Sequence, residues 1–88
     1  MQRDAFIARL TQVQQTVEQL LAELRANEHD KFAAHLYRSR REYRLACERA
    51  GKGGKQIERC LISTFRDAEK MGFQGEFRTW EHLLRIGD

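Results

Sequence analysis

The first apolar stretch of the chain repeats at alternating spacings of four and three residues, which is the a/d pattern of an amphipathic helix. Its members are Phe6, Leu10, Val13, Val17, Leu20 and Leu24. Polar helix formers, chiefly glutamine and glutamate, fill the intervening positions. The pattern predicts a first helix over about residues 4–26. Its apolar stripe packs either against helices of the same chain or in a dimeric coiled coil.

Two long segments in the middle of the chain also show helical periodicity, and both stop at glycine. The second predicted helix covers residues 31–50 and ends at Gly51, and the third covers residues 55–71 and ends at Gly72. Phe73 directly follows Gly72, which favours a Schellman ending in which the residue after the glycine packs back onto the helix.

A short fourth helix is predicted over residues 76–85, with its apolar side chains facing inward. These are Phe77, Trp80, Leu83 and Leu84. With no proline in 88 residues, long helices are the expected structure. The expected fold is therefore all-α, a single helical domain over residues 1–88. It is a small bundle of three longer amphipathic helices plus a short C-terminal helix.

The polar segment at residues 27–30 interrupts the apolar periodicity between the first two predicted helices. Asn27 suits a left-handed position after a helix, and Asp30 suits the N-cap of the next helix, so a tight turn is one interpretation. No glycine or proline intervenes. One long helix continuing through Ala50 is the alternative, and it would favour an oligomer.

The composition indicates a cytoplasmic protein without a cofactor. No apolar run is long enough for a membrane span, and residues 1–6 do not begin a signal-peptide pattern. In the cytoplasm, Cys47 and Cys60 are expected to be reduced thiols. The three histidines are scattered and no CxxC motif occurs, so we expect no metal site. No nucleophile has an evident base partner, so we expect no enzymatic activity.

Positive charge is concentrated in the middle of the chain. Residues 38–59 contain eight Lys or Arg and three Asp or Glu, a local net charge of +5 against +3 for the whole chain. Helical spacing places Lys55, Arg59, Arg66 and Lys70 in one row, where like charges four residues apart repel. Such a row favours contact with an anionic partner.

The arginines of residues 31–50 form a second candidate anion-binding surface. Arg40 and Arg41 have no acidic residue three or four positions later, whereas Arg38 and Arg44 are followed at four positions by glutamates. The segment Gly51–Lys55 joins the two surfaces. Its backbone amides and Lys52 could cradle a phosphate, but it lacks the serine or threonine and the preceding strand of a nucleotide-hydrolysing loop.

These patterns predict a protein that binds nucleic acid mainly through phosphate contacts. The expected surface comprises Arg40, Arg41, Arg44, Lys52, Lys55, Arg59, Arg66 and Lys70. The alternative is a protein–protein interaction module that self-associates as a homodimer or docks a partner helix through the first helix. Its surface would be the first helix, with Leu10, Val13, Val17, Leu20 and Leu24, or an apolar groove involving Leu45 and Ile62, which lie outside the apolar stripes. Docking of an acidic protein on the basic row is a third hypothesis.

Overall fold

The computed structural model describes residues 2–12, 15–50 and 54–87, and within these ranges the secondary structure is entirely helical. The helices are α1 (Gln2–Leu10), α2 (Val17–Ala26), α3 (Lys31–Ala50), α4 (Gly54–Lys70) and α5 (Phe77–Arg85). The predicted all-α class is confirmed. The predicted number of helices is wrong, because two helices occupy the segment expected to form the first one.

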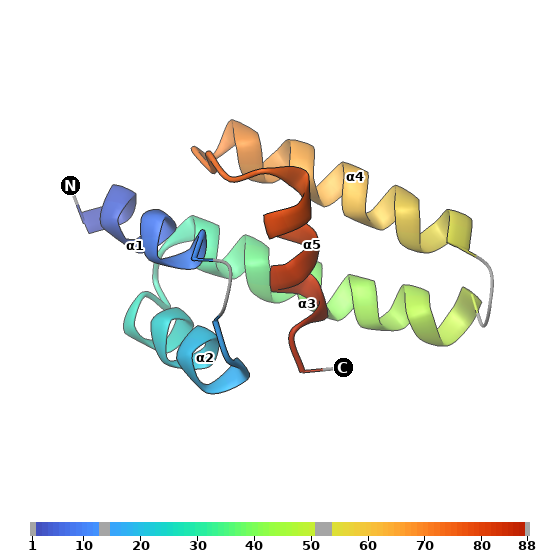
Figure 1. Ribbon diagram of the computed structural model, residues 1–88, viewed down its shortest axis with the longest axis horizontal. Helices are drawn as coiled ribbons and strands as arrows, with labels where there is room; N and C mark the ends of the chain where they lie inside the picture. Colours follow the sequence, from blue (N-terminus) through green and yellow to red (C-terminus); the bar gives the residue numbers. More distant parts are fainter. Residues whose placement is uncertain (1, 13–14, 51–53, 88) are drawn as a thin grey trace.

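The two longest helices form the centre of the arrangement. α3 and α4 lie side by side and antiparallel, and α5 crosses them and contacts both (Figure 1). α1 and α2 lie at the N-terminal end of α3 (Figure 1). In the described part of the chain, no helix has the combination of length and apolar character that crossing a membrane requires.

The first predicted helix is interrupted because local side chains end α1 and start α2. The Gln15 amide donates a hydrogen bond of 2.7 Å to the Arg9 carbonyl just before the end of α1. Thr16 is the N-cap of α2. Its hydroxyl accepts from the Gln19 backbone N–H at 3.2 Å, and the Gln19 side chain accepts from the Thr16 N–H at 3.0 Å. The first backbone N–H groups of a helix have no partner within the helix. This reciprocal capping box gives two of these groups a hydrogen-bond acceptor and so stabilises the start of α2.

Folding α1 back beside α2 places the apolar stripe inside the chain's own core. Leu10, Leu20 and Leu24 have no exposed surface, and Val17 is half-buried against the same core. The ion pair of Arg9 with Glu23, at 2.9 Å, joins the two helices on the outside. The stripe therefore packs within its own chain rather than along a continuous coiled-coil seam.

The segment at residues 27–30 is a turn, so the alternative of one long helix through Ala50 is wrong. The Asp30 carboxylate accepts a hydrogen bond of 2.7 Å from the Phe32 N–H and thereby caps α3, as expected. Asn27 differs from the expectation, because its φ of −124° is not left-handed. Its side-chain amide instead donates to the Glu23 carbonyl at 2.9 Å.

The end of α4 has the predicted Schellman geometry. Gly72 has a φ of +108°, a conformation that side chains other than glycine rarely adopt. The Phe73 N–H donates to the Ala68 carbonyl at 3.0 Å, and the Gly72 N–H donates to the Glu69 carbonyl at 3.1 Å. Phe73 is buried, so this turn directs the chain across the bundle toward α5.

Trp80 of α5 fills the centre of the core and joins the three central helices. The His35 ring of α3 stacks on it with ring centroids 5.5 Å apart, and Phe73 meets it edge-on at 5.4 Å. The indole N–H donates to the Thr64 hydroxyl at 2.9 Å. His35 Nε2 lies 3.0 Å from the Thr64 carbonyl, which can only accept, so this nitrogen carries a proton. These hydrogen bonds provide partners for polar groups that would otherwise be costly to bury.

Candidate functional site

Arg40, one of the expected phosphate contacts, holds the C-terminal end of α5. Its guanidinium donates to the Leu83 carbonyl through Nη1 and to the Ile86 carbonyl at 2.8 Å through Nη2. The last carbonyls of a helix have no intrahelical partner and carry partial negative charge, so a cation is favourable there. The structure therefore gives Arg40 a structural contact in place of a free position on the basic surface.

The neighbouring arginines of α3 surround a hollow of about 490 Å³ between α2 and α3. We call it the arginine hollow; it is lined by Val17, Leu21, Tyr37, Arg38, Arg40, Arg41, Arg44 and Gly87. Arg38, Arg41 and Arg44 are exposed, and Tyr37 is 41% exposed. Among the described residues of the lining, Val17 and Leu21 are the apolar aliphatic ones, and both come from α2. The hollow thus combines cations with an aromatic ring and an apolar wall.

The three exposed arginines of this hollow have no carboxylate partner among the described residues. No Asp or Glu oxygen there lies within 4.0 Å of the side-chain nitrogens of Arg38, Arg41 or Arg44. The sequence spacing permits ion pairs of Arg38 with Glu42 and of Arg44 with Glu48, one turn further along α3. The structure contains neither pair. Arg38 was not among the expected contacts, although its spacing of three residues from Arg41 was a readable signal.

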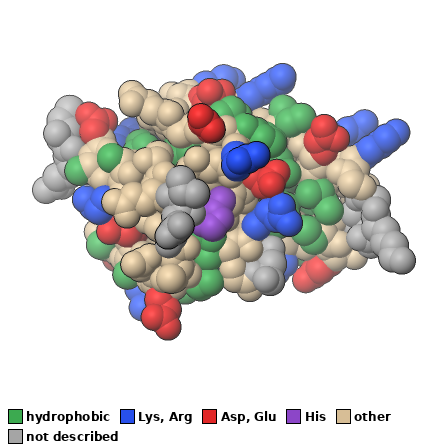
Figure 2. All heavy atoms as spheres, in the orientation of Figure 1, with side chains coloured by type: hydrophobic (Ala, Val, Ile, Leu, Met, Phe, Trp, Pro, Cys, Tyr) green, Lys and Arg blue, Asp and Glu red, His purple; other side chains and the backbone are tan. Residues whose placement is uncertain are grey.

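The basic row of α4 forms a separate surface. We call Lys55, Arg59, Arg66 and Lys70 the α4 stripe. They are exposed, and the last three line a shallow hollow of about 360 Å³ with Ile62, Ser63 and Asp67. Figure 2 shows Lys and Arg side chains projecting along the edge of the molecule formed by α4. Here too, no described carboxylate lies within 4.0 Å of the side-chain nitrogens of the stripe.

The two basic surfaces do not form the single patch that the sequence suggested. The α4 stripe lies opposite the buried face of α4, which carries Leu61, Thr64 and Ala68. Arg41 likewise lies on the side of α3 away from its buried face. Because the two buried faces pack against each other, the basic faces point away from one another. Lys52 and the glycines at positions 51 and 53 lie outside the described residues, so the expected phosphate cradle does too.

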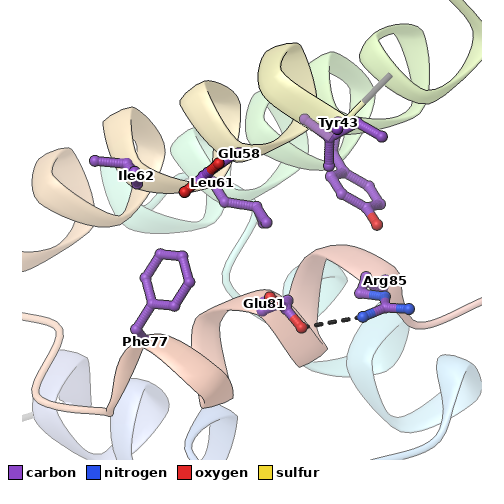
Figure 3. Close-up of a pocket in the computed structure, with 9 residues that line it drawn as sticks. Tyr43, Glu58, Leu61, Ile62, Phe77, Glu81 and Arg85 are labelled. Carbon is purple, nitrogen blue, oxygen red and sulfur yellow. Dashed lines mark hydrogen bonds and ion pairs between the residues drawn. The ribbon is translucent and has the colours of Figure 1, made fainter. Parts of the chain in front are cut away.

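An apolar hollow of about 690 Å³ lies between α4 and α5, with one residue from α3 (Figure 3). We call it the α4–α5 groove; its lining is Tyr43, Gly54, Ile57, Glu58, Leu61, Ile62, Phe77, Glu81 and Arg85. Phe77 was expected to face inward. It packs edge-on against Phe65 at 5.3 Å but remains 37% exposed and points from α5 toward α4 (Figure 3). Of its lining, the sequence pattern indicated only Ile62 as an exposed apolar residue, because the walls of the groove come from separate helices.

The alternative partner surface is dispersed by the fold. Leu10, Leu20 and Leu24 are fully buried, and Val13 lies outside the described residues. Leu45 and Ile62 are exposed, at 41% and 36%, as their positions outside the apolar stripes suggested. They lie on different helices, and only Ile62 lines the groove. The exposed apolar side chains of the groove are therefore Ile62 and Phe77, and the first apolar stripe is not among them.

The described residues offer little for covalent or metal chemistry. Burial raises the pKa of the half-buried Cys60 thiol, and Glu42 and Cys47 raise it further. Cys60 is therefore a protonated, weakly nucleophilic thiol at neutral pH. No group of three His, Cys, Asp or Glu side chains within residues 2–12, 15–50 and 54–87 is placed to hold a metal ion.

Comparison with known proteins found no protein similar to this chain. The chain matches no protein-family model, no curated protein and no solved structure. The two basic surfaces and the groove are therefore the candidate sites of this protein. Of these, the arginine hollow has the highest net positive charge, because its described lining holds four arginines and no carboxylate, whereas the hollow beside the α4 stripe holds three cations and Asp67.

Proposed function

We propose that this protein binds single-stranded nucleic acid, mainly through phosphate contacts in the arginine hollow. The observation that supports the proposal is the set of three exposed arginines around one hollow, none of which has a carboxylate partner among the described residues. Each guanidinium presents a planar fork of N–H donors that matches a phosphate. An anion in the hollow also relieves the repulsion between Arg38, Arg41 and Arg44, which are spaced three residues apart on one helix.

The spacing of the arginines suits a strand rather than one isolated phosphate. At a rise of 1.5 Å per residue, Arg38 and Arg44 are separated by about 9 Å along the axis of α3. Side chains spread over that distance contact successive phosphates of a backbone. Contacts to phosphates carry no base information, so binding is expected to depend little on sequence.

Tyr37 favours a single strand over a duplex. The residue is 41% exposed and lies in the lining of the hollow with the arginines. Stacking on an aromatic side chain requires an accessible base face, which a single strand presents and an intact duplex does not. Val17 and Leu21 add apolar surface beside the ring.

The test is the salt dependence of binding to a fluorescent oligonucleotide, compared between two charge-matched variants. One variant changes Arg38, Arg41 and Arg44 to Gln. The control changes three residues of the α4 stripe, Arg59, Arg66 and Lys70, to Gln. Each variant loses three positive charges, which takes the formal net charge from +3 to zero. Because net charge is equal in the two variants, only the position of the charge differs.

Each phosphate contacted on a single strand contributes about −0.7 to the slope of log K against log salt, so three arginines contribute about −2. We expect the slope of the variant with Arg38, Arg41 and Arg44 changed to Gln to be shallower than the native slope by about that amount. The slope of the α4 control should stay close to the native one. Equal losses in both variants, or a binding constant independent of salt, would overturn the proposal. A native protein that prefers duplex DNA or RNA would refute the single-strand assignment, and Tyr37→Ala should weaken single-strand binding about tenfold.

A further inference from the structure

The α4–α5 groove and the shallow hollow beside the α4 stripe share Ile62 as a lining residue and therefore form one continuous surface. We propose that this surface docks an amphipathic helix of a partner protein, one that carries acidic side chains beside its apolar stripe. The proposal does not depend on nucleic-acid binding, because the arginine hollow shares no lining residue with the groove or with the α4 hollow.

The apolar part of the surface is the groove itself. Ile62 and Phe77 leave more than a third of their surface exposed on opposite walls, and Leu61 lies beside Ile62 on the α4 wall (Figure 3). Ile57 and the Tyr43 ring extend the lining beyond Leu61. A groove between two helices with an apolar floor is the usual receptor for the apolar face of a third helix. Such burial removes Ile62 and Phe77 from water.

The charged part of the surface runs along one side of the groove. Arg59 lies three residues before Ile62 and Arg66 four residues after it, so both are its neighbours on the surface of α4. Lys70 continues the row by one more turn. These cations have no carboxylate partner within 4.0 Å among the described residues. They are therefore available to acidic side chains that flank the apolar stripe of a docked helix.

The opposite wall of the groove is close to neutral. Glu81 and Arg85 of α5 form an ion pair at 3.0 Å (Figure 3). The remaining acidic residues of the combined lining are Glu58 and Asp67, both on α4. The cations of the α4 stripe outnumber them. Charge complementarity thus favours acidic side chains on the stripe side of the docked helix.

A second copy of this chain does not provide a helix of the required chemistry. The apolar faces of α1 and α2 are buried in their own core. The exposed Leu45 of α3 stands one position from Arg44 and four from Arg41 and Arg49, so that helix is basic and would be repelled by the α4 stripe. Nucleic acid could contact the stripe but would leave Phe77 and Ile62 exposed. A helix from another protein covers both parts of the surface.

The proposal is tested with synthetic helical peptides of about fifteen residues, labelled for fluorescence anisotropy. The first peptide has leucines at helical spacing with glutamates along one flank, and the second replaces those glutamates with lysines. We expect the glutamate peptide to bind about tenfold or more tightly than the lysine peptide. The exposed pair Arg66→Glu with Lys70→Glu should reverse this preference without touching the core.

The groove is tested by changing Ile62 to Gln together with Phe77 to Ser, which should weaken the glutamate peptide about tenfold. The matched control is Leu45→Gln, since Leu45 is equally exposed but lies outside the groove. Circular dichroism verifies folding, and the charge-reversal pair decides the question if the groove variant is unfolded. Equal binding of both peptides, no binding of the glutamate peptide, or an equal loss with Leu45→Gln would each overturn the proposal.

The same titrations separate this surface from the proposed nucleic-acid site. The variant with Arg38, Arg41 and Arg44 changed to Gln should bind the glutamate peptide normally. A single-stranded oligonucleotide should not displace the peptide from the native protein. Displacement would show that the α4 stripe contacts phosphates and would overturn the docking proposal, whereas a failure of oligonucleotide binding alone leaves the peptide result intact.

Discussion

A change at Arg40 is expected to affect the stability of this protein with little effect on its binding to phosphates. Arg40 lies in the middle of the most basic segment, yet its guanidinium donates to the carbonyls of Leu83 and Ile86 at the end of α5. Changing Arg40 to Gln removes the charge and the fork geometry from this helix end. We therefore expect Arg40→Gln to lower the free energy of unfolding while leaving phosphate binding largely intact.

The size of the effect follows from the two contacts. Hydrogen bonds from a charged donor contribute about 1.5–3 kcal/mol each, and a cation at a helix C-terminus adds about 0.3–1 kcal/mol. Arg40 is only half-buried, so water replaces part of what is lost. The net loss is expected to be about 1–3 kcal/mol. An 88-residue domain has about 4–13 kcal/mol in total, so this is a large fraction.

The assay is urea unfolding followed by circular dichroism and by the fluorescence of Trp80, the only tryptophan. The control is Arg41→Gln, which removes the same charge from an exposed neighbour that has no carboxylate partner in the described part of the chain. This change should alter stability by less than about 0.5 kcal/mol. In oligonucleotide titrations, Arg41→Gln should reduce the slope of log K against log salt, and Arg40→Gln should change this slope less. Equal destabilisation by the two changes, or a larger loss of salt slope for Arg40→Gln, would refute the assignment of Arg40 to the end of α5.

Two further predictions concern the helix break and the half-buried thiol of Cys60. Thr16→Ala removes the hydroxyl that caps α2 and should cost about 1 kcal/mol in urea unfolding; no measurable change would contradict the capping box. Because burial raises the pKa of Cys60 above 9.0, the folded state binds its proton more tightly than the unfolded state. This contribution to stability is complete below pH 9 and is lost as pH rises through the folded pKa. Cys60→Ser should flatten that decline, and an unchanged pH profile would contradict it.

Much of the helical structure was readable from local pattern. The apolar spacing located α3, α4 and α5 to within about a residue at each end, because a helix is held by contacts three and four residues apart. The Schellman ending at Gly72 and the cap at Asp30 could also be predicted from the sequence, since both depend on a few adjacent residues. These features needed no knowledge of the rest of the fold.

The break between α1 and α2 shows where pattern alone misled. The sequence Thr16-Val17-Glu18-Gln19 is a readable capping box, but the heptad spacing runs straight through it and predicts one helix. Both signals are local, and they conflict. Packing of Leu10, Leu20 and Leu24 into the same core decided between them, because a fold-back buries the stripe within one chain.

The amino-acid sequence by itself determined that the protein is helical and that positive charge is concentrated in residues 38–59. Only the tertiary structure decided how that charge is used. It turned Arg40 to the end of α5, placed the α4 stripe on a face away from the arginine hollow, and left Phe77 exposed beside Ile62. The physical reason is one of range. Helix formation depends on neighbours within one turn, whereas a hollow or a groove depends on side chains from helices that meet only after folding.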